Sequence, residues 1–235
     1  MDEISKNPVL IGKMFDEISP KYDLLNHLIS AGQDIRWRKK AIKELRKLNH
    51  DYKAILDLAA GSGDLTREML TLSSDIVISA DISQHMLKIT SEKIKDKRNV
   101  LIRADASNLP FGDDTFDLVG ISFGVRNFEN LDKAMMEIFR VLKPGGKFLT
   151  IEMFKSASKN FILKGFLFYF NKLVPRVGKV ISRSDYAYDY LFKSVASFKT
   201  IYEYKSLLKN TGFTVLCSKN NFLGIVYSTI ASKPV

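Results

Sequence analysis

The sequence predicts a doubly wound α/β fold: a seven-stranded sheet, mostly parallel with an antiparallel closing strand, and helices on both faces. Short apolar runs alternate with helix-like stretches between about residues 54 and 153, which is typical of right-handed βαβ units. The runs are apolar at consecutive positions, as expected for parallel strands that are buried on both faces. Two further apolar runs end the chain, and they predict the strands that close the sheet.

The individual elements follow from local patterns, beginning with a buried strand over Ala54 to Leu58. The glycine turn after this strand leads into a helix that begins near Asp64. Six more strands are expected at Ile76 to Ala80, Val100 to Arg103, Phe116 to Ser122, Lys147 to Met153, Phe213 to Ser218 and Gly224 to Ala231. Three more helices are expected: one capped by Ser83, one over Leu131 to Leu142 before Pro144-Gly145-Gly146, and one near Ser197 to Asn210 before Gly212.

The length of 235 residues and the 46% of hydrophobic residues predict one large α/β domain rather than two small ones. Residues 1–52 are expected to form a helical N-terminal extension, and residues 155–195 an insertion rich in aromatic residues and lysine. We expect no signal peptide and no membrane-spanning segment. The single cysteine, Cys217, excludes an intrachain disulfide and fits a reducing cytoplasm.

The net charge of +10 is concentrated in one segment, because residues 155–209 contain eleven Lys/Arg and three Asp/Glu. A basic excess indicates nucleic acid, an anionic membrane surface or an acidic partner. It is also typical of a lysine-rich protein that is merely well solvated, so charge alone selects none of these partners.

Four successive strands end in glycine or polar residues. Gly61 and Gly63 follow the first strand, where glycine permits positive φ and a close approach of backbone N–H groups to a ligand. Asp81 ends the second strand, where a carboxylate can accept both hydroxyls of a ribose. Asp105-Ala106 follows the third strand, in a position to meet an adenine edge, and Ser122 ends the fourth. Because ligands of such sheets bind at the carboxyl ends of the strands, these residues predict one nucleoside site.

The glycine pattern argues against a dinucleotide. Dinucleotide sites normally have the pattern G-x-G-x-x-G, and Thr66 occupies the position of the third glycine. A dinucleotide also needs a cradle for its pyrophosphate. The sequence therefore favours a smaller ligand with a single nucleoside.

These positions resemble the signature of class I S-adenosylmethionine-dependent methyltransferases. The resemblance is carried by Asp57-Leu-Ala-Ala-Gly-Ser-Gly-Asp64, Asp81, Asp105-Ala106 and Leu142-Lys-Pro-Gly-Gly146. A closer resemblance is to the UbiE/MenG/COQ5 family of quinone-biosynthesis C-methyltransferases. It is carried by Met14-Phe-Asp-Glu-Ile-Ser-Pro-Lys-Tyr-Asp-Leu-Leu-Asn26, Trp37-Arg38, Asn108-Leu-Pro-Phe111, Phe116-Asp117, Ser122-Phe-Gly-Val-Arg-Asn127, Leu173-Val-Pro-Arg-Val-Gly178, Tyr188-Asp-Tyr-Leu191, Thr211-Gly-Phe213 and Leu223-Gly-Ile225.

The family resemblance covers nearly the whole chain, and the blocks around Lys21-Tyr22-Asp23 and Arg126-Asn127 are more specific than the glycine turn. Two departures stand out. Ser62 occupies a position where the family usually has threonine, but it keeps the hydroxyl group. The stretch Lys193 to Phe198 lacks the family's usual proline.

The resemblance implies a Rossmann-like methyltransferase fold, S-adenosyl-L-methionine as cofactor and S-adenosyl-L-homocysteine as product. The implied substrate is a prenylated hydroquinone, demethylmenaquinol or 2-polyprenyl-6-methoxy-1,4-benzoquinol, methylated on a ring carbon in menaquinone or ubiquinone biosynthesis. The expected cofactor-binding residues are Asp57, Gly61, Ser62, Gly63, Asp81, Ile82, Asp105, Ala106 and Ser122.

Methylation of a ring carbon needs a phenol that loses its proton, and hence a base or a cation that stabilises the phenolate. Arg126 is the expected cation, and Asn127 is expected to hydrogen-bond a quinol oxygen. Tyr22 and Asp23 are expected to orient the substrate or to help stabilise the phenolate. The alternatives are a structural ion pair for Arg126, and packing and capping roles for Tyr22 and Asp23.

We expect no metal, because the three histidines show no spacing typical of metal ligands. They are His27, His50 and His85, and they are interpreted as surface residues.

Nine Phe/Tyr interleaved with lysine lie between Phe161 and Phe192, which favours contact with a membrane interface or a prenyl tail. The alternative is that the aromatic residues form the core of the insertion. The expected location is the cytoplasm, with peripheral contact at the inner face of the membrane through residues 155–195. A homodimer or a complex of quinone-biosynthesis enzymes is also expected.

Two other functions are weighed against this one. A nucleic-acid methyltransferase is not favoured, because the sequence contains no N/D-P-P-Y/F tetrapeptide and a single cysteine excludes a two-cysteine mechanism. A non-catalytic scaffold would be expected to have a degraded cofactor site, yet the glycine turn, Asp81 and Asp105 are intact.

Overall fold

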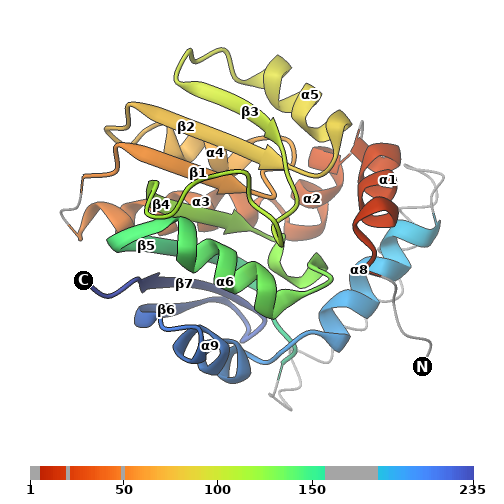
Figure 1. The fold of residues 1–235 in the computed structure, drawn as a ribbon. Helices are drawn as coiled ribbons and strands as arrows, with labels where there is room; N and C mark the ends of the chain where they lie inside the picture. Colours follow the sequence, from red (N-terminus) through yellow and green to blue (C-terminus); the bar gives the residue numbers. More distant parts are fainter. Residues whose placement is uncertain (1–5, 20–21, 49–50, 157–184) are drawn as a thin grey trace.

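The computed structural model describes residues 6–19, 22–48, 51–156 and 185–235. Seven strands form one sheet in the order β3-β2-β1-β4-β5-β7-β6. Strand β7 runs antiparallel to both of its neighbours, and the pairings among β1 to β5 are parallel. The predicted fold class is therefore confirmed, with β7 as the antiparallel strand of the closing pair (Figure 1).

The strands are β1 (Ala54–Leu58), β2 (Ile76–Asp81), β3 (Asn99–Arg103), β4 (Phe116–Ser122), β5 (Leu142–Met153), β6 (Thr214–Phe222) and β7 (Val226–Ser232). The helices are α1 (Pro8–Ile18), α2 (Tyr22–Ser30), α3 (Gln33–Arg46), α4 (Asp64–Met69), α5 (Gln84–Lys93), α6 (Leu131–Val141), α8 (Asp185–Ser197) and α9 (Ile201–Asn210), with a short 3-10 turn η2 (Val125–Asn127). None of the described helices is long and apolar enough to span a membrane.

Both faces of the central strands are buried, as the consecutive apolar residues predict. In β1, Ile55 packs with α3 and α4 on one face, while its neighbour Leu56 belongs to the cluster that includes α6 and α9 on the other. Leu118 and Val119 of β4 divide in the same way. Successive side chains of a strand point to opposite faces, so a continuous apolar run fills both cores.

Two predicted element starts were wrong. The helix expected near Ser197 to Asn210 begins only at Ile201, because Thr200 caps it, and Ser197 is the last residue of α8. The Thr200 hydroxyl accepts from the N–H of Glu203 at 3.3 Å, and the Glu203 carboxylate accepts from the N–H of Thr200 at 2.6 Å, which is a capping box. Strand β5 also begins earlier than expected, at Leu142, which pairs with Phe116 before the register shifts.

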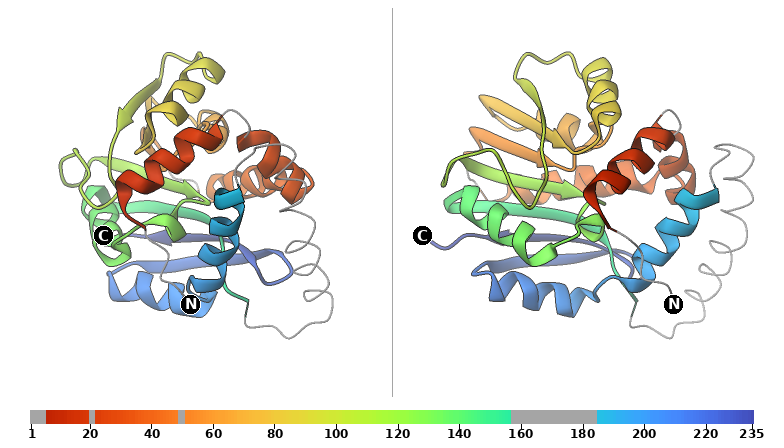
Figure 2. Two further views of the ribbon diagram at one scale, coloured as in Figure 1. Left: turned by 90° about the vertical axis from the view of Figure 1, so that its right-hand side faces the viewer. Right: turned by 45° about the vertical axis from the view of Figure 1, so that its right-hand side comes forward.

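Helices α1 and α8 lie together at the end of the sheet where β1 to β4 terminate (Figures 1 and 2). Ile11 and Met14 of α1 pack against Tyr190 of α8. Helix α2 lies at the same end and contacts α3. Of the predicted insertion 155–195, residues 157–184 lie outside the described residues, and its last part forms α8. Helices α1, α2 and α8 thus lie together over the carboxyl edge of the sheet.

Candidate active site

A pocket with about 700 Å³ of empty volume, part of it open to solvent, lies at the carboxyl ends of β1 to β4. The predicted site residues that line it are Tyr22, Gly61, Asp81, Ile82, Asp105, Ala106, Ser122 and Asn127. Those that do not are Asp23, Asp57, Ser62, Gly63 and Arg126. Residues far apart in the sequence therefore meet in one pocket.

The turn after β1 has a backbone that only glycine accommodates at Gly63. Its φ is +84°, and a Cβ atom there would lie 2.9 Å from side-chain carbons of both Thr90 and Ile94. Gly61 has a φ of +56° and lies against the ring of Tyr22. The Thr90 hydroxyl donates to the Gly61 carbonyl at 2.8 Å. Helix α5 thus packs directly against the turn and keeps Gly61 at the pocket wall.

Asp81 ends β2 with its carboxylate held by backbone donors on both sides. One oxygen accepts from the N–H of Gly61 and the other from the N–H of Ser83, each at 2.8 Å. Burial raises the pKa of Asp81, although these hydrogen bonds favour the charged form. The carboxylate is therefore fixed in orientation at the wall of the pocket, where its remaining lone pairs can accept hydroxyl groups.

The ends of β3 and β4 supply the next part of the wall. The Asp105 carboxylate accepts from the N–H of Ser107 at 2.8 Å, and Ala106 beside it is buried. The Ser122 hydroxyl accepts from Nε of Arg38 at 3.3 Å. Arg38 belongs to α3, so the orientation of the Ser122 hydroxyl depends on this helix as well as on β4.

Asp57 lies in a different environment from the one expected. Its side chain has no exposed surface and does not line the pocket. One oxygen accepts from the Thr66 hydroxyl at 2.5 Å, and the other has no hydrogen-bond partner among the described residues. Burial raises the pKa of Asp57 to about 7. The position taken by the third glycine in dinucleotide sites thus holds Thr66, a hydrogen-bond partner of Asp57.

Asp23 connects α2 to the glycine turn. It accepts a short hydrogen bond from the Ser62 hydroxyl, and Lys93 bridges Asp23 and Asp64 at 2.7 and 2.8 Å. These contacts hold α2 in place, and the preceding residue, Tyr22, lines the pocket. Burial raises the pKa of the Tyr22 hydroxyl, so it is a neutral phenol at neutral pH. These contacts match the alternative considered for Asp23, which was a role in capping and packing.

Arg126 forms a buried ion pair beside the pocket. One of its terminal nitrogens lies 2.8 Å from a Glu152 carboxylate oxygen and 2.6 Å from the Phe123 carbonyl. Glu152 has no exposed surface, and its second oxygen accepts from the backbone N–H of Arg126 at 3.2 Å. These contacts match the alternative considered for Arg126, which was a structural ion pair. The next residue, Asn127, does line the pocket, and its side-chain oxygen accepts from the Tyr190 hydroxyl at 3.1 Å.

Comparison with known proteins identifies the family. The model of the ubiE/COQ5 methyltransferase family matches residues 3–233. The chain belongs to this family. The demethylmenaquinone methyltransferase of Chlorobaculum tepidum is 40% identical over 212 residues, which are 89% of this chain and 86% of that protein. The ubiquinone/menaquinone biosynthesis C-methyltransferase UbiE of Rickettsia prowazekii is 36% identical over 234 residues, 95% of this chain and 92% of that protein.

Solved structures with low sequence identity share the fold of this ubiE/COQ5 family member. The cyclase SpnF matches with a TM-score of 0.70 at 16% identity, and the match covers 96% of this chain and 95% of that one. A cyclase with this architecture illustrates that a fold does not determine a reaction. The chemistry of the ubiE/COQ5 family member must therefore be argued from its pocket.

Sequence reasoning missed the part of the pocket wall that comes from α1 and the residues before it. Lys6, Ile11 and Phe15 line the pocket. The Asp16 carboxylate anchors this helix by accepting from the Ser83 hydroxyl at 2.5 Å and from the N–H of His85 at 3.2 Å. The family block that begins at Met14 was a signal that this segment matters. No local pattern, however, indicated contacts between residues almost 70 positions apart.

One group of possible metal ligands exists among the described residues: His27, Asp34 and Asp64. The guanidinium of Arg38 occupies the position of a counter-ion, 2.7 Å from Asp34 and 3.4 Å from Asp64. Although burial alone would raise it, the pKa of Asp34 is lowered by hydrogen bonds from Ser30 and Arg38. The carboxylates are thus neutralised by side chains of the protein. His27, expected at the surface, is half-buried and bonds Asp34 at 2.9 Å.

Proposed function

We propose that this ubiE/COQ5 family member transfers the methyl group of S-adenosylmethionine to a ring carbon of a prenylated hydroquinone. The observation that carries the proposal is the shared pocket. The nucleoside-type wall of Gly61, Asp81 and Asp105 faces the same space as Tyr22 and Asn127, which belong to the family's most specific sequence blocks. The names of the relatives support demethylmenaquinol or a ubiquinone precursor as substrate.

The residues of the first wall fit adenosylmethionine. The buried Asp81 carboxylate suits the ribose hydroxyls, while Asp105 and the Ala106 backbone suit the adenine edge. The absence of a Cβ atom at Gly61, which lines the pocket, leaves room for the backbone to approach the ligand. When bound, the cofactor supplies an electrophilic methyl group on a sulfonium. The protein's task is to align the ring carbon with that methyl group and to exclude water.

The substrate half of the pocket serves the ionisation of the quinol. A hydroquinone hydroxyl would lose its proton to water, and the ring carbon beside the resulting phenolate would accept the methyl group that bound S-adenosylmethionine supplies, with S-adenosylhomocysteine as the leaving group. The same carbon would then lose its own proton to water, which restores the aromatic ring. Tyr22 and Asn127, which line the pocket, would hydrogen-bond the quinol oxygens. The Arg126–Glu152 pair beneath them holds the turn that carries Asn127.

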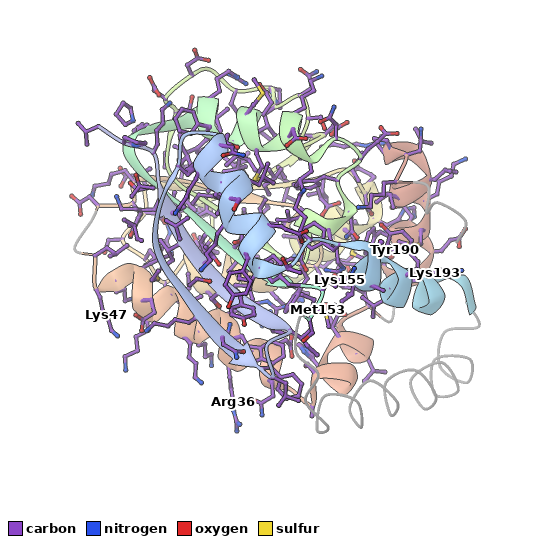
Figure 3. All side chains as sticks on the ribbon, turned by 90° about the horizontal axis from the view of Figure 1, so that it is seen from below. Arg36, Lys47, Met153, Lys155, Tyr190 and Lys193 are labelled. Carbon is purple, nitrogen blue, oxygen red and sulfur yellow. The ribbon has the colours of Figure 1, made fainter. Side chains whose placement is uncertain are left out.

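Peripheral contact with the inner face of a membrane is the second part of the proposal, because a prenyl tail must be drawn from lipid. Exposed cations lie on α3 at Arg36 and just after it at Lys47, which pairs with Glu44. Two more lie on the described sides of residues 157–184, at Lys155 and Lys193 (Figure 3). Anionic lipid attracts such cations. Cosedimentation with anionic vesicles at low salt is the expected result, and no binding under those conditions would contradict this part.

Transfer assays test the reaction. The protein is incubated with methyl-labelled S-adenosylmethionine and, in separate reactions, with reduced demethylmenaquinone, reduced 2-polyprenyl-6-methoxy-1,4-benzoquinone and RNA. Label in one or both quinols is expected, and the relative rates identify the preferred ring. Labelled RNA with unlabelled quinols would overturn the proposal.

The ribose assignment is tested by Asp81→Ala. We expect S-adenosylhomocysteine to bind about 10- to 100-fold more weakly, since losing a charged acceptor costs about 1.5–3 kcal/mol. Isothermal titration calorimetry measures this change. Asp75→Ala, at an exposed residue just before β2, is the matched control. Unchanged affinity in Asp81→Ala would show that the ribose binds elsewhere.

A further inference from the structure

The pocket needs a cation on its substrate side, and Arg126 is poorly suited to provide it. The charge of Arg126 is compensated by Glu152 at 2.8 Å, and its guanidinium does not line the pocket. A buried ion pair is close to neutral when felt from outside. Removing either partner would leave a buried charge uncompensated. The pair is therefore better suited to stabilising the fold than to stabilising a transient phenolate.

Lys6 is the one cationic residue among those that line the pocket in the described part of the chain. It directly precedes α1, whose start is set by Asn7, a cap that accepts from the N–H groups of Val9 and Leu10. The ammonium group lies 5.9 Å from the ring centroid of Phe198. Within the described ranges, no carboxylate lies at ion-pair distance from it. Burial and the positive charge of Arg126 lower the pKa of Lys6, and the negative charge of Glu152 raises it by less, so the charge of Lys6 is only partly compensated.

Asn127 offers hydrogen-bond donors to the same pocket. The Tyr190 hydroxyl donates to its side-chain oxygen at 3.1 Å, which determines which end of the amide is the acceptor. No described residue accepts from the amide nitrogen, so both of its N–H donors remain available. Tyr190, on α8 (Figure 3), is 5% exposed and packs against Ile11 and Met14. The amide orientation is therefore maintained by a buried contact.

We propose that the ammonium group of Lys6 and the side-chain amide of Asn127 form the site that stabilises the substrate phenolate, and that Tyr190 positions the amide. This inference rests on the proposed function. The phenol proton passes to water, and the oxyanion is met by one cation and one neutral donor. Electron density would then move from the oxygen into the ring to form the bond to the methyl carbon, the electron pair of the C–S bond would stay on sulfur, and the ring proton would pass to water. Fixed donors and charges in a site sheltered from water stabilise such developing charge most effectively.

The first test compares three variants with the reduced quinone as methyl acceptor. Lys6→Met keeps the length of the side chain but removes the charge, and kcat is expected to fall about 100-fold. Lys6→Arg keeps the charge and is expected to recover a large part of the rate. Lys13→Met, at an exposed lysine of α1, serves as the control and is expected to leave the rate unchanged. Affinity for S-adenosylhomocysteine should stay within twofold in all three. Wild-type kcat in Lys6→Met would overturn the inference.

Tyr190→Phe tests the positioning role, because it retains the packing ring and removes only the hydroxyl. We expect kcat to fall about tenfold while the KM for S-adenosylmethionine and the melting temperature change little. A purely structural tyrosine would instead lower the melting temperature and leave kcat of the folded enzyme unchanged. That second pattern would contradict the positioning role.

A third measurement needs no turnover and separates this inference from the proposed function. The probe is 4-nitrophenol, whose anion absorbs visible light, titrated in the presence of protein and S-adenosylhomocysteine. Wild type should lower the pKa of the bound probe, and Lys6→Met should not. Equal shifts in both proteins would overturn the role of Lys6 even if quinols are methylated. A shift that depends on Lys6, together with no transfer to any quinol, would support the anion site while contradicting the proposed substrate.

Discussion

At the scale of single residues, Asp57 and Asp81 show how position alone separates two identical side chains. Each lies in or at the end of a neighbouring parallel strand, β1 or β2. Asp81 receives two backbone N–H donors and faces the pocket. Asp57 has only Thr66 as a hydrogen-bond partner among the described residues, one of its oxygens has no partner, and it is sealed from solvent. Backbone donors to both oxygens stabilise a charged carboxylate, whereas full burial with one oxygen unpaired favours the neutral acid.

A hydrogen-bond chain around Asp57 supports its neutral form. Thr66 lies 2.5 Å from Asp57 and 2.9 Å from Ser79, and Ser79 donates to the Asn99 side-chain oxygen at 2.8 Å. With an ionised Asp57, the two hydroxyl protons cannot serve all three contacts. When Asp57 is ionised, it accepts from the Thr66 hydroxyl. When Asp57 is protonated, it can donate to Thr66 instead, which leaves the Thr66 proton for Ser79 and gives every contact a proton.

This chain predicts a pH dependence of stability. The folded pKa of Asp57 is raised from 3.8 to about 7, so the folded protein binds the extra proton between these values. Its contribution to stability is present at low pH and is lost as pH rises through the folded pKa, by about 1.4 kcal/mol per pH unit. Asp57→Asn imitates the protonated acid and should remove this part of the slope.

Urea unfolding of wild type and Asp57→Asn between pH 5 and pH 8 measures the difference. Asp81 also has a raised pKa, but it is present in both proteins and cancels from the comparison. Asp132→Asn, at an exposed residue of α6, is the control. Parallel stability curves for wild type and Asp57→Asn would show that Asp57 is ionised throughout this range.

At the scale of elements, helix α1 covers part of the pocket and is anchored to the N-terminus of α5. Ser83 caps α5 by accepting from the N–H of Met86 at 3.0 Å, and its hydroxyl donates to Asp16 of α1. Asp16 therefore places a negative charge at the N-terminus of α5, where the helix dipole favours it. Since Ile11 and Phe15 line the pocket, this anchor holds part of the pocket wall.

Asp16→Ala should weaken the attachment of α1 to α5. Loss of the hydrogen bonds to Ser83 and to the N–H of His85 is expected to cost about 1–2 kcal/mol of local stability. Amide hydrogen exchange in α1 should then accelerate about 5- to 30-fold, and S-adenosylhomocysteine should dissociate faster. Glu17→Ala, at an exposed residue of the same helix, is the control. Unchanged exchange in Asp16→Ala would mean that apolar packing alone holds α1.

At the scale of the whole molecule, the site exists only when the N-terminal helices, four strand ends and α8 are assembled together. Its lining extends from Lys6 to Glu129 in the sequence, and Tyr190 supports it from α8. Ligand binding is therefore coupled to the tertiary structure as a whole. A ligand that binds only the folded state stabilises it by mass action.

S-adenosylhomocysteine at a concentration of about 100 Kd should stabilise the fold by about 2.7 kcal/mol. For a protein of this size that corresponds to a rise in Tm of roughly 5–10 °C. Differential scanning fluorimetry measures it, and Asp81→Ala should need a higher ligand concentration for the same rise. A wild-type Tm that does not respond even to millimolar ligand would favour a non-catalytic scaffold.

The sequence by itself determined the sheet, the glycine turn and the family. Continuous apolar runs must be buried on both faces, and a φ of +84° at Gly63 admits no ordinary side chain. That Gly61, Asp81, Asp105 and Ser122 line one pocket was predictable, because parallel strands place their carboxyl ends along one edge. The apolar runs and the glycine turn are local features of the sequence, and the common edge of the strand ends follows directly from the topology of the sheet.

Only the tertiary structure decided which side chains face the pocket and with what charge. Asp57 and Asp81 look equivalent in sequence, yet burial and hydrogen bonding separate them. Arg126 is adjacent to Asn127, but it pairs with Glu152, 26 residues away, while Lys6 reaches the pocket from the start of the chain. Burial, pairing and pKa depend on atoms brought together from distant parts of the chain, and no spacing along the sequence encodes those distances.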